Sequence, residues 1–114
     1  MMAYLGWLIA IALQLWSAVG LSNPELRIQY RIETVDWAIA YAYPDRQKTC
    51  HIVFGEYAVS SPEEYLLSLV AHEVGHCLGL WEHSRQGVMS NRRGKLLPTS
   101  RDVLTPRVMI AVWN

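Results

Sequence analysis

Apolar and polar positions after residue 23 predict a short sheet followed by one long helix. Residues 25–32 alternate between apolar and polar side chains, which is typical of a half-buried strand. Residues 49–57 are mostly apolar and indicate a second, more buried strand that ends or bulges at Gly55. In residues 61–79 the apolar side chains recur at helical spacing, so this stretch predicts a helix whose apolar stripe packs on the sheet.

Both ends of the long helix carry sequence signals. Ser61 is placed to cap the N-terminus, Pro62 suits the first helical position, and Glu64 completes a capping box with Ser61. Gly79 is placed to end the helix in a left-handed turn. Because no proline interrupts the segment, we expect a straight helix between these residues.

The segment 34–43 fits two periodicities at once. Its apolar residues can be counted at helical spacing, and its valine, isoleucine and aromatic residues also alternate as in a strand. Three alanines, with Thr34 as an N-cap, favour a helix, and Pro44 ends the element in either case. We therefore expect a short helix here.

The C-terminal part of the chain predicts a loop and a last helix. Residues 85–100 read as loop, and residues 100–113 indicate a helix that is broken or restarted at Pro106. Together with the strands and the long helix, these elements predict an α+β fold in which a short sheet packs on that helix.

Residues 1–23 differ from the rest because they contain no charged side chain. Ala18–Gly20 fit the small-x-small pattern of a signal-peptidase site, so residues 1–20 are predicted to be a signal peptide and the protein to be secreted or extracytoplasmic. An uncleaved membrane anchor is the alternative, because about 20 apolar residues can span a bilayer. The basic residues Arg27 and Arg31, which follow the segment, favour that orientation of an anchor in which the domain stays in the cytoplasm. A buried first helix is the weaker interpretation, since uninterrupted hydrophobicity leaves no face for water.

Length and charge limit the remaining possibilities. With 114 residues the chain holds one domain, which we place at residues 21–114. Its formal net charge is +0, so no excess of charge attracts nucleic acid, and we expect none to bind. We also expect a monomer. Cys50 and Cys77 form one disulfide if the protein is exported and stay two buried thiols if it is not, and the sequence leaves both open.

Metal-ligating side chains concentrate in Ala71–Ser84, AHEVGHCLGLWEHS. His72 and His76 stand one helical turn apart on one face, so their imidazoles can converge on one metal ion. Glu73 is rotated by about 100° from His72 and flanks the metal, where it can reach a bound water. This is the H-E-x-x-H arrangement of zinc peptidases, in which the histidines bind and the glutamate acts as base. His51 has no neighbour at ligand spacing, and we interpret it as a strand residue.

The run HEVGHCLGL followed by EHS resembles the zinc site of the metzincin peptidases, and of their matrixin branch in particular. In that pattern the third ligand follows soon after the glycine that here is Gly79. Trp81 is inserted relative to the pattern, so Glu82 occupies the strict third-ligand position and His83 comes one residue later. We favour His83 as the third ligand, because neutral imidazole binds zinc well and loops accept a single insertion at little entropic cost. Glu82 is the alternative ligand.

The resemblance extends to Met89, which is placed as the methionine of the turn beneath the metal. It implies a small metzincin-like zincin domain with a short sheet on the zinc-binding helix, a Met-turn and a C-terminal helix. It also implies that an extended peptide substrate pairs with a sheet edge, which we expect near His51–Tyr57.

The function that the resemblance implies is that of a zinc-dependent endopeptidase acting on peptides or proteins. His72, His76 and His83 would hold Zn²⁺, which lowers the pKa of a bound water to about 7 and polarises the scissile carbonyl. Glu73 would be the general base that takes a proton from the water and delivers it to the leaving amine. A non-catalytic zinc-binding or membrane-anchored interaction protein is the alternative, motivated by the short chain and the irregular third-ligand spacing.

Overall fold

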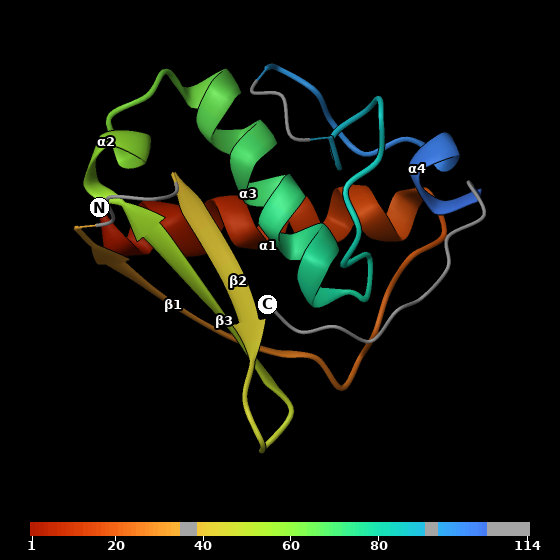
Figure 1. Ribbon diagram of the computed structural model, residues 1–114, viewed down its shortest axis with the longest axis horizontal. Helices are drawn as coiled ribbons and strands as arrows, with labels where there is room; N and C mark the ends of the chain where they lie inside the picture. Colours follow the sequence, from red (N-terminus) through yellow and green to blue (C-terminus); the bar gives the residue numbers. More distant parts are fainter. Residues whose placement is uncertain (35–38, 91–93, 105–114) are drawn as a thin grey trace.

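A three-stranded sheet and the helices packed on it make up the computed structural model, which describes residues 1–34, 39–90 and 94–104 (Figure 1). The strands are β1 (Arg27–Glu33), β2 (Ala40–Pro44) and β3 (Thr49–Gly55), in the spatial order β1-β3-β2. β1 runs parallel to β3, and β2 runs antiparallel to it. The helices are α1 (Met2–Ala18), α2 (Glu56–Val59), α3 (Glu63–Cys77) and α4 (Ser100–Leu104). The expected α+β class is confirmed.

β1 and β3 lie where the hydrophobic patterns predict strands, so both predictions are confirmed. On β3, Cys50, Ile52 and Phe54 belong to the hydrophobic core and alternate with residues of the other face. The isoleucines of β1 pack against the same core. α1 and α3 pack together on this face of the sheet, which places the core between the two helices and the strands. β3 ends at Gly55, and the short α2 follows directly.

The helix expected over residues 34–43 is wrong for its second half, which lies in β2. Residues 35–38 of that segment lie outside the described residues. Tyr41 and Tyr43 stack on one face of β2 with ring centroids 5.9 Å apart, whereas Ala42 is buried in the core. Pairing with β3 therefore outweighs the helix propensity of the alanines, as tertiary contacts regularly do.

β3 is the central strand, so the predicted substrate edge near His51–Tyr57 is wrong. Within the described residues β1 and β2 flank it, which makes β2 an edge strand. The Gly55 N–H donates to the Ile39 carbonyl at 2.8 Å, at the end of the β2–β3 ladder. Because hydrogen-bonded and non-hydrogen-bonded pairs alternate in an antiparallel ladder, the backbone polar groups of Ala40 and Ala42 point away from β3.

α3 begins later than its sequence signals indicate. Its N-cap is Pro62, and no side chain caps its N-terminus, so the predicted capping box of Ser61 and Glu64 is wrong. The extended backbone of Pro62, with ψ 147°, leaves Ser61 outside the helix. The Glu64 carboxylate instead pairs with the Lys95 ammonium at 2.9 Å. At the other end Gly79 has φ +109°, which is the left-handed turn that the sequence predicts.

α1 contributes one buried face to the core. Leu5, Leu8 and Trp16 are each fully buried. The Trp16 indole N–H also donates to the backbone carbonyl of Ala71 on α3 at 2.8 Å, so α1 and α3 are joined by a buried hydrogen bond. Within the described part of the chain, no helix is both long enough and apolar enough to cross a membrane. A signal peptide or membrane anchor at residues 1–20 stays a prediction.

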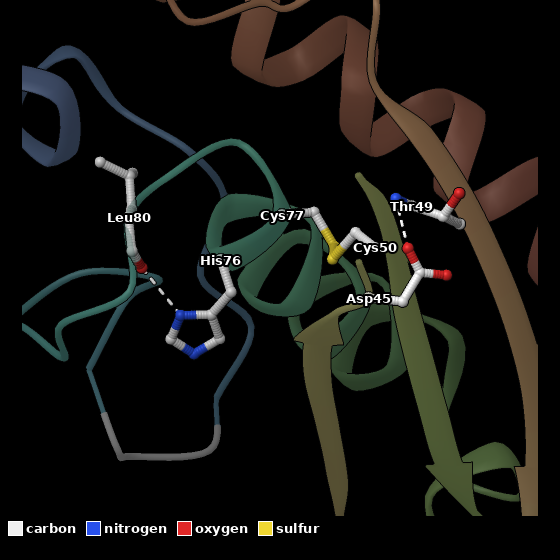
Figure 2. Close-up of a disulfide and its surroundings, with 6 residues drawn as sticks. All are labelled: Asp45, Thr49, Cys50, His76, Cys77 and Leu80. Atoms are coloured by element: carbon white, nitrogen blue, oxygen red, sulfur yellow. Dashed lines mark hydrogen bonds between the residues drawn. A yellow bond between two sulfur atoms is a disulfide. The ribbon is translucent and has the colours of Figure 1, made fainter. Parts of the chain in front are cut away.

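A disulfide joins β3 to the C-terminal end of α3 (Figure 2). Its Cα atoms are 5.6 Å apart, and both cysteines are buried. Of the two alternatives left open for Cys50 and Cys77, the structure has the bonded one. The bond attaches the residue after His76 to the central strand, and so it fixes the last turn of α3 relative to the sheet.

The C-terminal predictions are confirmed as far as the described residues extend. The described part of residues 85–100 is mainly loop, and α4 begins the expected last helix. The backbone N–H and the hydroxyl of Thr99 donate to the Asp102 carboxylate at 2.8 and 2.9 Å, which stabilises the start of α4. Residues 105–114 of the predicted helix lie outside the described residues.

Replacing Trp16 with alanine tests whether α1 belongs to the folded core. We expect Trp16→Ala to lower the free energy of unfolding by about 3–5 kcal/mol, because a buried indole is lost and a cavity is left. Chemical denaturation of the full-length chain measures this loss. Trp7 lies on the same helix but is 55% exposed, so Trp7→Ala is the control, with an expected change within about 0.5 kcal/mol. Equally small losses in both variants would show that α1 is not part of the core.

Removing the disulfide tests its contribution to stability. The cysteines are 27 residues apart in sequence, and closing a loop of that length is expected to stabilise the fold by about 3–4 kcal/mol. The double variant Cys50→Ser/Cys77→Ser should therefore unfold at a clearly lower temperature than the wild type. A reductant should lower the wild-type Tm towards that of the double variant and leave the variant unchanged. A wild-type Tm that does not respond to reductant would contradict the expectation.

Candidate metal centre

His72 and His76 project from adjacent turns of α3 and meet at their Nε2 atoms, which are 3.1 Å apart. Their ring centroids are 4.6 Å apart, and the ring planes are nearly perpendicular, at 87°. The spacing follows from the helix itself, because residues four apart lie on the same face. The sequence-predicted ligand pair is therefore brought together by α3 alone.

Backbone carbonyls determine which nitrogen of each ring faces the centre. The Nδ1 of His76 donates to the Leu80 carbonyl at 2.7 Å (Figure 2). The Nδ1 of His72 donates to the Val88 carbonyl, also at 2.7 Å. A carbonyl oxygen only accepts, so each Nδ1 carries the hydrogen and each neutral ring directs the lone pair of its Nε2 to the centre. Two lone pairs at this separation repel one another unless a cation lies between or beside them.

The turn at Gly79 returns the chain to the same place and supplies a third imidazole. The Gly79 N–H donates to the His76 carbonyl at 2.9 Å, and the Leu80 N–H donates to the Gly75 carbonyl at 3.0 Å. The ring of His83 then lies 5.1 Å from that of His72 and 5.0 Å from that of His76, between centroids.

His72, His76 and His83 together could hold a metal ion. One ligand atom from each lies within 4.8 Å of those of the other two. His83 is exposed, whereas His76 is buried, so the cluster reaches the surface at His83. Glu82, the alternative third ligand, is not a member of this group within the described residues.

Burial favours the neutral form of two of the imidazoles, which is the form that binds metal ions. Burial is the largest cause and lowers the pKa of His72. The hydrogen bond to the Val88 carbonyl raises this pKa, and the electrostatic effect of the neighbouring His83 lowers it. His83 is exposed as a residue, but partial burial of its ring also lowers its pKa. A neutral ring can offer a lone pair without first losing a proton.

Glu73 is a buried carboxyl group on the same turn of α3. The residue is only 3% exposed, and its Oε2 is buried with no hydrogen-bond partner. Burial raises the pKa of Glu73 to about 8. A buried carboxyl oxygen without a partner is costly, and in native proteins such a group commonly marks a missing ligand or a catalytic role.

Met89 lies beneath α3, next to the ligand-bearing turn. The residue is fully buried, and its backbone carbonyl accepts from the Ser84 N–H at 2.9 Å. A Cβ built at Gly75 would come within 2.5 Å of the Met89 sulfur and 2.8 Å of Cζ2 of Trp16. Glycine at position 75 therefore permits both side chains to approach α3 closely.

His51 lies on the sheet, in a setting that differs from the cluster. Its Nε2 is 2.7 Å from the Asp45 carboxylate, and its ring stacks on Tyr43 with centroids 4.9 Å apart. The structure thus places it on β3 as the strand residue that the sequence indicates.

Two features of the site were missed by sequence reasoning. The carbonyls of Leu80 and Val88, which orient the ligand rings, have no signature in side-chain identity. Trp81, whose ring stacks on His76, was visible only as the insertion in the metzincin-like spacing. The insertion showed that the spacing departs from the metzincin pattern at Trp81. It gave no indication that Trp81 contacts His76.

Comparisons with protein-family models, with curated proteins and with solved structures find no match to this chain. The function is therefore inferred from the chemistry of the cluster and from the motif that builds it.

Metal analysis of His83→Ala beside Glu82→Ala identifies the third ligand. We expect His83→Ala to lose most of the bound metal, because two imidazoles alone hold an ion weakly, and Glu82→Ala to retain about one ion per chain. Elemental analysis after extensive dialysis gives the stoichiometry. Loss of metal in Glu82→Ala with retention in His83→Ala would reverse the assignment. Retention in both would exclude each residue as a required ligand.

Proposed function

We propose that the chain is a zinc-dependent endopeptidase that hydrolyses peptide bonds in extended peptide or protein substrates. Three imidazoles gathered at an open surface, with a buried glutamate on the same helical turn, support this proposal. The H-E-x-x-H spacing and the resemblance of HEVGHCLGL and EHS to the metzincin zinc site agree with it. A minimal metzincin-like domain is accordingly the fold family that we propose.

Zinc is the ion that best suits the ligand set. Nitrogen ligands at about 2.0–2.1 Å from a tetrahedral ion lie about 3.3 Å from one another. The 3.1 Å between the Nε2 atoms of His72 and His76 is close to this separation. Three protein ligands leave a fourth position free, which is typical of catalytic zinc sites, whereas structural sites use four.

The unpartnered Oε2 of Glu73 is the observation that carries the proposal of catalysis. A structural zinc site needs no buried carboxyl group beside its ligands. Glu73 lies next to His72 in sequence, is buried, and has one oxygen for which the described residues provide no donor. A substrate water near the cluster would supply that donor.

The protein groups of the proposed mechanism have separate tasks. Zinc, when bound, provides a Lewis acid and a water whose pKa is lowered to about 7. Glu73 takes a proton from the attacking water and passes it to the leaving amine. Burial alone raises the pKa of Glu73 to about 8, which favours the protonated form, so the role of base requires the nearby cation, whose charge lowers this pKa and favours the carboxylate. The carbonyls of Leu80 and Val88 keep the ligand rings in one orientation.

β2 is the edge at which we propose that the substrate pairs. α3 packs against β2 more extensively than against β3, so this edge lies on the side of the metal helix. The backbone groups of Ala40 and Ala42 point away from β3, and an extended peptide can use them as an added strand.

An extracytoplasmic location is proposed together with this activity. The Cys50–Cys77 disulfide supports it, because disulfides persist in oxidising compartments and are rare in the cytosol. We further propose that the protein acts as a monomer, and that it acts without nucleic acid, which a formal net charge of +0 does not attract.

Glu73→Gln separates metal binding from catalysis. The amide keeps the shape of the side chain but cannot accept the proton, so we expect zinc content to be unchanged and cleavage to fall by at least about 100-fold. Cleavage of an unstructured protein, followed by electrophoresis and mass spectrometry, measures the activity. Glu64→Gln is the matched control, since Glu64 lies on the same helix with an exposed side chain and should retain full activity.

Cleavage retained in Glu73→Gln would remove the glutamate from the mechanism. Wild-type protein that binds zinc but cleaves nothing in a broad peptide library would favour the non-catalytic zinc-binding function instead.

A further inference from the structure

Trp81 is the residue that interrupts the metzincin-like spacing, and it lies directly against the metal cluster. Its indole ring stacks on the His76 imidazole, with centroids 5.4 Å apart and planes 12° apart. Trp81 is also partly buried and packs against the hydrophobic core. The inserted residue is therefore seated on a ligand and is not looped out into solvent.

His76 is held by two consecutive residues of the turn. The Leu80 carbonyl bonds its Nδ1 at 2.7 Å, and the Trp81 ring covers one face of the imidazole. Leu80 itself is fixed, because it is only 8% exposed and its N–H donates to the Gly75 carbonyl at 3.0 Å. The hydrogen bond to Leu80 fixes the position of the Nδ1 edge of the ring, and the stacking of Trp81 fixes the plane of the ring.

His72 provides an internal comparison. Its Nδ1 is also bonded to a carbonyl, that of Val88. The ring contacts found among the described residues pair His72 with the other two histidines: it lies edge-on to His76, at 87°, and stacks on His83, at 28°. Stacking by an indole therefore distinguishes His76 from the other ligand on α3.

We propose that Trp81 is a positioning residue of the metal centre, which holds the His76 imidazole in the plane needed for coordination and favours its metal-bound form. The face of an indole ring is electron-rich and attracts positive charge. An imidazole that binds a divalent cation takes up part of that charge, so stacking should be stronger with the metal than without it. The inference rests on the proposed metal site, and it does not require that the protein cleaves peptides.

Three substitutions at position 81 separate stacking from simple burial. Trp81→Phe keeps an aromatic face, Trp81→Leu keeps apolar bulk without that face, and Trp81→Ala removes both. We measure Zn²⁺ affinity of the full-length chain by competition with a chromophoric chelator, and the ligand geometry from the visible spectrum of the Co²⁺-loaded protein. Trp7→Ala, which removes an exposed tryptophan of α1, is the control.

We expect Trp81→Leu and Trp81→Ala to weaken Zn²⁺ binding about tenfold, in the range found when groups that orient a metal ligand are removed. Trp81→Phe should stay within about threefold of the wild type, because a benzene ring retains most of the stacking. The Co²⁺ bands should change in Trp81→Leu and be preserved in Trp81→Phe. Trp7→Ala should match the wild type in both measurements.

Equal Zn²⁺ affinities of Trp81→Phe and Trp81→Leu would overturn the inference, because apolar burial alone would then explain the residue. If Trp81→Ala loses helical signal in circular dichroism, the comparison of phenylalanine with leucine decides the question. A wild-type chain that binds neither Zn²⁺ nor Co²⁺ would overturn the metal site and this inference together. If Glu73→Gln retains cleavage, the proposed role of Glu73 is lost, but the proposed role of Trp81 is unaffected.

Discussion

The meeting of two imidazole nitrogens is the constraint on which the rest of the site depends. The Nε2 atoms of His72 and His76 are 3.1 Å apart, and both Nδ1 atoms are bound to backbone carbonyls. Neither ring can turn its lone pair away without losing a hydrogen bond that is buried for His76 and partly buried for His72, and a buried group left unsatisfied costs about 1–3 kcal/mol. The two lone pairs therefore repel one another unless a proton on one ring or a metal ion relieves the repulsion, and His83 completes a group that could hold the metal ion.

Support for this geometry comes from elements that are far apart in sequence. Gly75 lacks a side chain, so Trp16 of α1 and Met89 of the following loop approach α3 from below, one residue from His76. The disulfide attaches the next residue, Cys77, to the central strand. Helix, loop and sheet thus all contact the last two turns of α3. In a domain of 114 residues with a small core, a bound metal would add to these contacts and contribute to folding stability.

Sequence reasoning located the parts of the site that local geometry determines. His72 and His76 could be paired because spacing on a helix fixes their relation without knowledge of the fold. β2 could not be assigned in the same way, since its pairing partner is distant and its alanines favour a helix locally. The carbonyls that orient the rings were invisible, because every residue has one and only the path of the loop brings Leu80 and Val88 to the histidines. The predicted capping box is not formed, because the backbone of Pro62 is extended and the helix begins one residue later than the motif requires.

The packing of α1 against α3 bears on the proposed location of the protein. Cleavage of residues 1–20 as a signal peptide would remove Trp16 and its hydrogen bond to the Ala71 carbonyl. It would also expose the surface of α3 at Gly75 to water. Insertion of the same residues in a bilayer would surround with lipid the face that the structure buries in the core. Either fate is therefore an alternative to the packing of α1, and not an addition to it. The disulfide is typical of an oxidising compartment. If the proposed extracytoplasmic location holds, the packing of α1 in the core requires that the first helix stay attached after export.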